Sequence, residues 1–205
     1  MNCGSHTDEV VAAAAALVNV ATPGERRGRS YAVPTGDDLT AMIGQALLEA
    51  RRQTSTPPAS RAPAFVELAA AVRPVFEFVD RDRFDEAAET VNELLARYEP
   101  APLLARHDGQ PWHLHFPGRA TADRSGWGGG ISVGLATVLG SDYADRLGLC
   151  TASACNRVFV DVSRNGTRRF CSTACQNRVK AAAHRARAKE GSKEGSESEE
   201  GIADP

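Results

Sequence analysis

Four cysteines near the C-terminus have the residue type and the spacing of a metal site. They follow the pattern C-x4-C-x15-C-x3-C, as Cys150, Cys155, Cys171 and Cys175. Thiolates are preferred ligands of structural zinc, which takes four of them in a tetrahedron. Two close pairs joined by a hairpin-sized segment can bring four sulfurs to one point, so the pattern predicts one structural Zn²⁺. Two disulfides or four unrelated thiols are the alternatives, and the paired spacing disfavours both.

The residues between and after the cysteines predict how this site is built. Residues 157–162 alternate like a strand, an Asn-Gly dipeptide gives a strong turn signal, and residues 168–170 return as a second strand. A helix is expected next, with Thr173 as its N-cap and Cys175 in its first turn, where the helix dipole favours a thiolate. The expected order of knuckle, hairpin, knuckle and helix is that of a treble-clef-like finger, which would fold only with its metal.

Charge is segregated along the chain. The net charge is −2 over 205 residues, but residues 1–145 carry −6, residues 146–189 carry +9 and residues 190–205 carry −5. The basic block holds ten Lys and Arg residues and one acid. A block of this kind in an acidic chain is typical of a polyanion-binding module. The alternative is a solvated basic face without a partner, but ten cations against one acid are more charge than solubility requires.

The helix expected over residues 177–189 arranges these cations. Val179 and three alanines form one ridge, which we expect to pack on the finger's hairpin, with basic residues on both flanks. Alanines cannot hydrogen-bond to base edges, so base readout would fall to Arg168, Arg169 or Arg178. The candidate nucleic-acid-binding residues are Arg164, Arg168, Arg169, Arg178, Lys180, His184, Arg185, Arg187 and Lys189.

The predicted fold class is a mainly α N-terminal domain with a small β-hairpin, followed by the small four-cysteine zinc finger and a tail. Residues 21–36 read as a loop, and Pro74 is expected to kink or break the helix that contains it. The domains are expected at 1–145, 146–189 and 190–205, with separate cores in the first two and a disordered acidic tail in the third. Helices are expected at 9–18, 37–53, 64–80, 83–98 and 131–140, and the hairpin at 102–116.

Several classes of protein are disfavoured. The apolar run from Val10 to Val18 is too short to span a bilayer, and the acidic residues before it do not suit a signal peptide, so a cytoplasmic protein is expected. His113 and His115 share a strand face without an obvious third ligand, so we assign them no metal. No set of residues suggests a catalytic site, and we expect a protein that is not an enzyme.

The C-terminal segment resembles a known family. Residues 147–187 are similar to the CGNR zinc finger through Cys175-Gln176-Asn177-Arg178, with Gln in place of Gly, and through the preceding RVFVDVSRNGTRRFCS segment. Residues 17–145 more weakly resemble the ABATE domain that usually precedes this finger, from their Leu-Val-Asn start to the 112–116 strand and the late helix. The resemblance implies a bacterial stress-induced transcription regulator.

We therefore expect a zinc-dependent, nucleoid-associated regulator whose finger binds DNA and whose N-terminal domain senses a signal or dimerises. An RNA-binding or ribosome-associated protein stays open, as does a small-molecule-binding protein with a purely structural finger. A homodimer and a small-molecule effector also stay open. The finger's aromatics, Phe159 and Phe170, are expected in its core, and the lack of exposed stacking aromatics favours a duplex over single strands.

Overall fold

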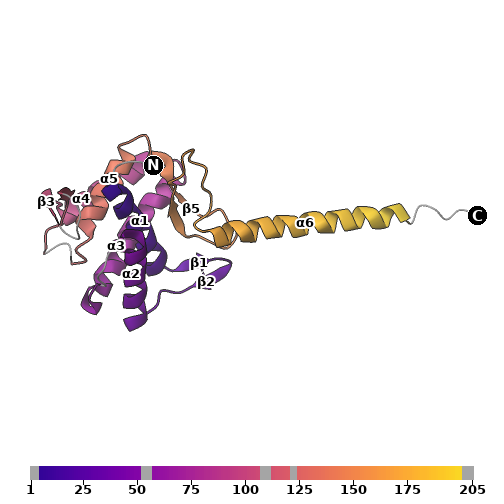
Figure 1. Ribbon diagram of the computed structural model, residues 1–205, viewed down its shortest axis with the longest axis horizontal. Helices are drawn as coiled ribbons and strands as arrows, with labels where there is room; N and C mark the ends of the chain where they lie inside the picture. Colours follow the sequence, from indigo (N-terminus) through magenta and orange to yellow (C-terminus); the bar gives the residue numbers. More distant parts are fainter. Residues whose placement is uncertain (1–4, 52–56, 107–111, 121–123, 200–205) are drawn as a thin grey trace, which may run out of the picture.

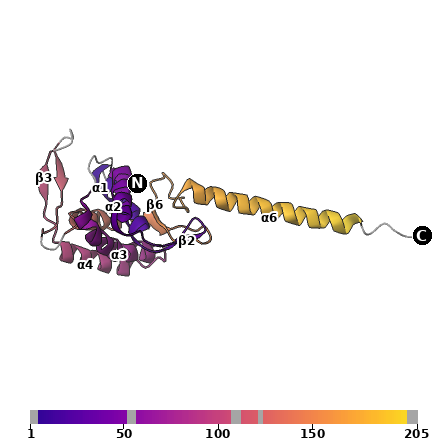
Figure 2. The same ribbon diagram turned by 90° about the horizontal axis from the view of Figure 1, so that it is seen from below.

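The computed structural model describes residues 5–51, 57–106, 112–120 and 124–199. It is mainly helical with three two-stranded antiparallel sheets, which confirms the predicted fold class. Helices α1 to α5 form the body of the molecule together with the sheets, and the long helix α6 projects from one end of this body (Figures 1 and 2). No helix in the described ranges is long and apolar enough to cross a membrane.

Helix α1 (Ser5–Ala21) is the centre of the body. It contacts α2 (Gly36–Arg51), α3 (Ala62–Val79), α5 (Gly128–Leu139) and strand β6 (Val158–Val160). A helix covered on every side must be apolar around its whole circumference, and its alanines let the neighbouring elements approach closely. Its fully buried residues are Val11, Ala13, Ala14, Leu17 and Val18.

Helices α3 and α4 (Phe84–Tyr98) form a second packed pair against the core. Helix α4 buries Ala87, Val91, Leu94 and Tyr98, which recur at helical spacing along one face. Helix α3 continues through Pro74, so the alternative of two helices broken at this proline is wrong. Val72 and Val75, which flank this part of the helix, pack in the core, and this packing offsets the hydrogen bond that proline cannot donate.

Two of the sheets are local hairpins. Strands β3 (Leu103–Ala105) and β4 (His113–His115) form the hairpin expected at 102–116, whose predicted turn lies outside the described residues. Strands β1 (Gly24–Arg26) and β2 (Arg29–Tyr31) lie within a segment that we expected to be a loop. The positive φ values of Arg27 (55°) and Gly28 (86°) are those of a two-residue hairpin turn, and the short strands carry too little pattern to reveal it.

The third sheet differs from the hairpin predicted for the finger. Strand β6 pairs with β5 (Leu147–Leu149), which precedes Cys150, and not with residues 168–170. The first cysteine pair therefore lies in the loop between the two strands, and residues 161–172 are irregular. Leu147, Val158 and Val160 belong to the main hydrophobic core, so the expectation of separate cores is wrong for this sheet.

Helix α6 (Thr173–Glu199) is longer and more exposed than predicted. It includes residues 190–199, which we expected to be disordered. No proline interrupts this segment, so the helix can continue through it. Residues 200–205 lie outside the described part. Its alanines at 182, 183 and 186 are exposed, so the expected packing of this ridge on the hairpin is wrong. Among the side chains of α6 that the structure describes, the contacts with the finger come from the first turns, through Cys175, Arg178 and Val179.

Arg157 holds the finger against the body. Its side chain is 1% exposed, and all five of its N–H groups are used in hydrogen bonds. They go to the carbonyl oxygens of Asn19, Thr22, Pro23 and Glu25 and to Oδ1 of Asn156, at 2.7–3.2 Å.

The surroundings of Arg157 suit a buried cation. Its guanidinium lies 5.1 Å from the ring centre of Tyr31, and the carbonyls around it are at the C-terminal end of α1, where the helix dipole is negative. Burial, followed by the nearby Arg73 cation, lowers the pKa of Arg157, although an arginine stays protonated at neutral pH. The buried charge is therefore solvated by the protein itself.

We predict that Arg157→Ala lowers the free energy of unfolding by about 3 kcal/mol or more, since several buried carbonyls lose a charged donor at once. Arg157→Lys is expected to recover only part of the loss, because three donors on one atom cannot reach acceptors on both sides. Denaturant unfolding with saturating zinc measures the effect. The exposed Arg164→Ala is the control, with a change within about 0.5 kcal/mol, and equal stability of Arg157→Ala and wild type would contradict the assignment.

Candidate metal centre

The four cysteine thiols converge on one point. The Sγ atoms of Cys155, Cys171 and Cys175 are 3.7–3.8 Å apart, and all four Sγ atoms lie within 4.8 Å of one another. Zinc–sulfur bonds of about 2.3 Å in a tetrahedron place the sulfurs about 3.8 Å apart, so the observed spacing fits Zn²⁺. The thiols are not joined as disulfides. In the described part of the chain, no other group of three or more potential ligands is found.

Each cysteine is positioned by a different local structure. Cys150 follows β5 and donates its amide to the carbonyl of Arg157, and Cys155 ends a tight loop that contains the left-handed residue Ala154. Cys171 precedes α6, and Cys175 lies in its first turn. The N-cap of this helix is Ser172 rather than the predicted Thr173, because the Ser172 hydroxyl accepts the amide hydrogen of Cys175 at 3.4 Å.

The β1–β2 hairpin supports the metal centre from the body. We call residues 150–156 the knuckle. The Gly28 amide donates to the carbonyl of Ala154 at 2.8 Å, and Glu25 exchanges hydrogen bonds with Asn156 at 2.9 and 3.1 Å. Arg178 of α6 lies over Gly28 and donates to the carbonyl of Ser153. The knuckle is thus held between the body and the start of α6.

These contacts also set the acidity of the thiols. Burial opposes ionisation of Cys155, but the backbone amides of Arg27 and Arg157 donate to its sulfur and lower its pKa to about 7. Burial raises the pKa of Cys150 and Cys171, and the neighbouring thiolates raise that of Cys171 further. Cys155 therefore ionises more readily than Cys150 or Cys171.

Residues 161–172, here named the return loop, are held by side chains instead of a strand. The buried carboxylate of Asp161 accepts the amide hydrogens of Ser163 and Arg168 at 2.8 and 2.7 Å. The Arg168 guanidinium donates to the carbonyls of Val160, Phe170 and Cys171. Arg146 donates to the carbonyl of Ser163 at 3.0 Å. These contacts replace the ladder that the sequence predicted and carry the chain back to Cys171.

The nucleic-acid candidates fall into two groups. The guanidinium groups of Arg168 and Arg178 are bonded to backbone carbonyls of the finger. The other described candidates are exposed: Arg164 and Arg169 on the return loop, and Lys180, His184, Arg185 and Arg187 on α6. Lys189 lies on α6, and its side chain is outside the described part.

Two arginines and a carboxylate that organise the site were not singled out from the sequence. Arg157 and Arg146 looked like members of a basic block, and Asp161 was noted only as its single acid. An acid directly after a buried strand and before an Asn-Gly turn was the available signal for Asp161. Nothing local marks Arg157, since four of its five hydrogen bonds go to carbonyls more than 130 residues away in the sequence.

We predict one zinc per purified chain. Cys175→Ser should lose the metal and expose the knuckle and the first turns of α6 to rapid hydrogen exchange. The amides of β5 and β6 should stay protected, because these strands share the main core. Elemental analysis and hydrogen-exchange mass spectrometry measure both effects, with Cys3→Ser as the control. Full zinc occupancy in Cys175→Ser would overturn the site.

Asp161→Asn should loosen the return loop. Burial acts to raise the pKa of Asp161, but its hydrogen bonds with Ser163 and Arg168 and the charge of Arg146 outweigh it, so the pKa is lowered. A lowered pKa in the folded state means that the carboxylate stabilises the protein above its unfolded pKa and loses this effect as the pH falls through the folded value.

The variant should therefore be about 1–3 kcal/mol less stable than wild type at neutral pH. The difference should stay constant down to about pH 5 and shrink only at lower pH. Urea unfolding at a series of pH values measures it. A difference that vanishes already near neutrality would contradict the role of the carboxylate.

Comparison with known proteins agrees with this geometry. The model of the family described as "CGNR zinc finger" matches residues 146–188, and that of ABATE, described as "Putative stress-induced transcription regulator", matches residues 11–150. No curated protein matches the chain. The ABATE match covers more than half of the 205 residues. The chain therefore belongs to the ABATE family and carries a CGNR zinc finger at its C-terminal end.

Proposed function

We propose that the protein is a zinc-dependent transcription regulator that binds duplex DNA through helix α6. One observation carries this proposal: the basic start of α6 projects from the body with its cations exposed (Figure 1). Residues 180–188 of α6 are all exposed, so this part of the helix is available to enter the major groove, which is wide enough to admit one.

The cations of α6 are placed to meet two phosphate strands. Lys180, His184 and Arg187 recur at spacings of four and three residues and share one side of the helix. Arg185 lies on the opposite side. Between the two sides are exposed alanines, including Ala182, Ala183 and Ala186. A helix this narrow can approach the groove floor, where alanine contacts thymine methyl groups, while the cations neutralise phosphates on each wall.

Hydrogen-bonded base readout would then depend on few residues. Arg168 and Arg178 already donate to backbone carbonyls of the finger, so Arg164 and Arg169, which are exposed on the return loop, are the candidates for base contacts. Phosphate contacts would supply most of the affinity and a small number of arginine contacts the sequence preference.

Two features favour DNA over RNA. Phe159 is 8% exposed and Phe170 packs against the cysteine cluster, so neither aromatic of the finger is free to stack on unpaired bases. The major groove of an RNA duplex is also too narrow to admit a helix. The region of residues 1–145 would then sense a signal or mediate self-association, in a protein that acts at the nucleoid in the cytoplasm.

The test is the affinity of the zinc-loaded full chain for duplex DNA as a function of salt concentration. The full chain is required because the finger's sheet belongs to the main core. Lys180→Ala and Arg187→Ala should each weaken binding to all sequences alike and reduce the salt slope by about one unit. Arg81→Ala, an exposed cation at the α3–α4 turn, is the matched control and should change neither quantity.

Structured RNA at matched salt is the second arm of this experiment. Binding to DNA that weakens in the α6 variants but not in Arg81→Ala supports the proposal. No binding to either nucleic acid, or a preference for RNA of about tenfold or more, would rule out the DNA-binding regulator.

A further inference from the structure

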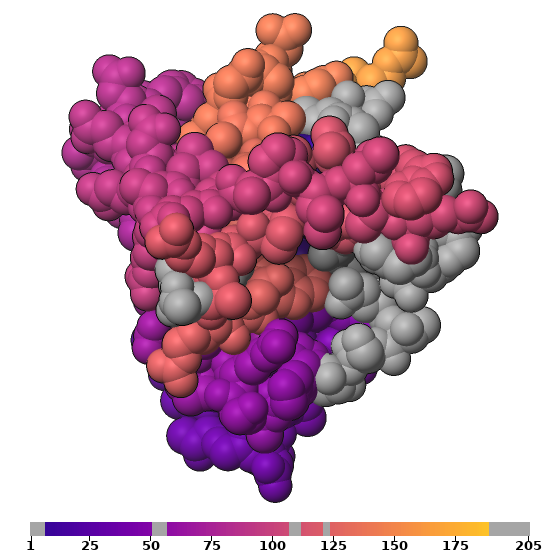
Figure 3. Space-filling model, turned by 90° about the vertical axis from the view of Figure 1, so that its left-hand side faces the viewer, coloured from indigo at the N-terminus to yellow at the C-terminus, as the bar shows by residue number. Residues whose placement is uncertain are grey.

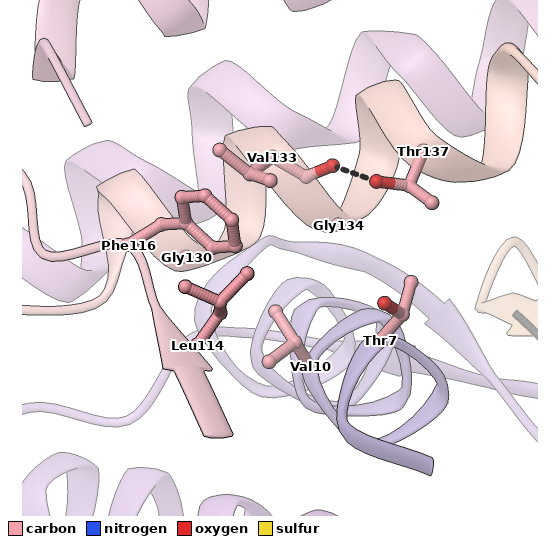
Figure 4. A pocket seen from close by; sticks show the side chains of 8 residues that line it. All are labelled: Thr7, Val10, Leu114, Phe116, Gly130, Val133, Gly134 and Thr137. Carbon is pink, nitrogen blue, oxygen red and sulfur yellow. Dashed lines mark hydrogen bonds between the residues drawn. The ribbon is translucent and has the colours of Figure 1, made fainter. Parts of the chain in front are cut away.

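A cavity that shares no lining residue with the metal centre lies between the beginning of α1, helix α5 and strand β4 (Figure 4). Its volume is about 300 Å³. Val10, Leu114, Phe116 and Val133 make its wall apolar, while the hydroxyl-bearing Thr7 and Thr137 lie together at one end. Nothing in the DNA-binding proposal uses this cavity.

Helix α5 contains four glycines near the cavity, and close packing against neighbouring residues accounts for three of them. A Cβ at Gly128 would lie 2.5 Å from Tyr98, and one at Gly129 would lie 2.4 Å from the backbone of Gly118, so both positions require glycine. A Cβ at Gly134 would touch Val10 and Val11 at 3.2 Å.

Close packing does not account for the glycine at position 130. A Cβ there meets no described atom within 4 Å, and the residue lines the cavity. A glycine inside a helix costs roughly 0.5–1 kcal/mol relative to alanine. Its effect here is to keep one wall of the cavity open.

The lining restricts the chemistry of an occupant. None of the described lining residues carries a charge, so an ionic ligand would lose its hydration without gaining a partner among them. An apolar cavity of about 150 Å³ accommodates benzene, so twice that volume suits a bicyclic molecule. The Thr137 hydroxyl donates to the carbonyl of Val133 at 2.8 Å, which leaves its oxygen able to accept a hydrogen bond.

We propose that this cavity is a binding site for a small neutral molecule, an aromatic bicycle with one hydroxyl group. The ring system lies between Val10, Phe116 and Val133, and its hydroxyl points toward the threonine end. The site is separate from the helix that we propose to bind DNA, and its occupancy does not depend on that function.

The rim of the cavity supports an apolar occupant. Leu114 is 51% exposed, its cross-strand partner Leu104 is 58% exposed, and Trp112, two residues before Leu114, is 63% exposed. The hairpin that carries them stands out from the face turned away from α6 (Figure 3). Large apolar side chains around an opening are typical of ligand sites.

The experiment titrates 2-naphthol into the zinc-loaded full chain and follows binding by calorimetry. We expect saturable 1:1 binding. Gly130→Leu should fill the cavity and weaken binding by about tenfold or more, whereas Gly130→Ala adds one methyl group and should change the affinity by less than about threefold. A Cβ at position 130 meets no described atom within 4 Å, so Gly130→Ala should be at least as stable as wild type in thermal unfolding, and the same measurement checks that Gly130→Leu remains folded.

2-Naphthalenesulfonate, which has the same rings and a fixed negative charge, should bind about tenfold more weakly than 2-naphthol or worse. The proposal is overturned by any of three results: no saturable binding of 2-naphthol, equal affinity in wild type and Gly130→Leu, or equal affinity for the sulfonate. Light scattering in the same samples tests another occupant. If wild type is a dimer that 2-naphthol or Gly130→Leu dissociates, the cavity belongs to a contact between two copies and not to a small molecule.

Discussion

The solvation of one buried guanidinium determines how the two parts of this protein fit together. Arg157 uses every N–H it has on groups that no single element could supply: the end of α1, the residues that follow it, the first strand of the β1–β2 hairpin and the adjacent Asn156. A cation removed from water is tolerated only when it is fully hydrogen-bonded. The end of α1, the β1–β2 hairpin and β6 must therefore all be in place together, which fixes the direction in which the knuckle leaves the body.

The metal centre consequently belongs to the body and is not an independent module. Arg157 and Cys155 are two residues apart, and their side chains are bonded to the same hairpin: the Arg157 guanidinium donates to the carbonyl of Glu25, and the Cys155 sulfur accepts the amide hydrogen of Arg27. The two family matches overlap at residues 146–150, which include β5. The overlap has a physical basis, because β5 completes the main core on one side and ends at the first metal ligand on the other. A boundary drawn through this strand separates residues that fold together.

Features set by local pattern could be predicted from the sequence, and features set by distant contacts could not. The cysteine spacing, the amphipathic helix at 84–98 and the hairpin near 102–116 each carry their own signal within one continuous segment of the sequence. The pairing of β6 with β5, and not with residues 168–170, depends on Val158 and Val160 entering a core built mostly by α1 and α3. The sequence therefore predicted the wrong partner strand for β6 and the wrong core for its side chains. The exposure of α6 was missed for the same reason, since a ridge of alanines is compatible with packing but does not require it.

The metal centre stabilises the first turns of the exposed helix α6. Most helical stability in proteins comes from tertiary packing, so a helix without tertiary contacts depends on the weaker intrinsic propensity of its residues. Residues 173–179 have support from the Ser172 cap, from Cys175 in the thiol cluster and from Val179 beside it. Beyond them, residues 180–188 depend on propensity alone, and their cations repel one another across the turns. An anionic partner removes that repulsion, so phosphate binding and helix order reinforce each other. The zinc site would then act as the fixed nucleus from which the helix that we propose to bind DNA extends. Loss of the metal would unfold the start of this helix and so make ordering of its remaining residues less favourable.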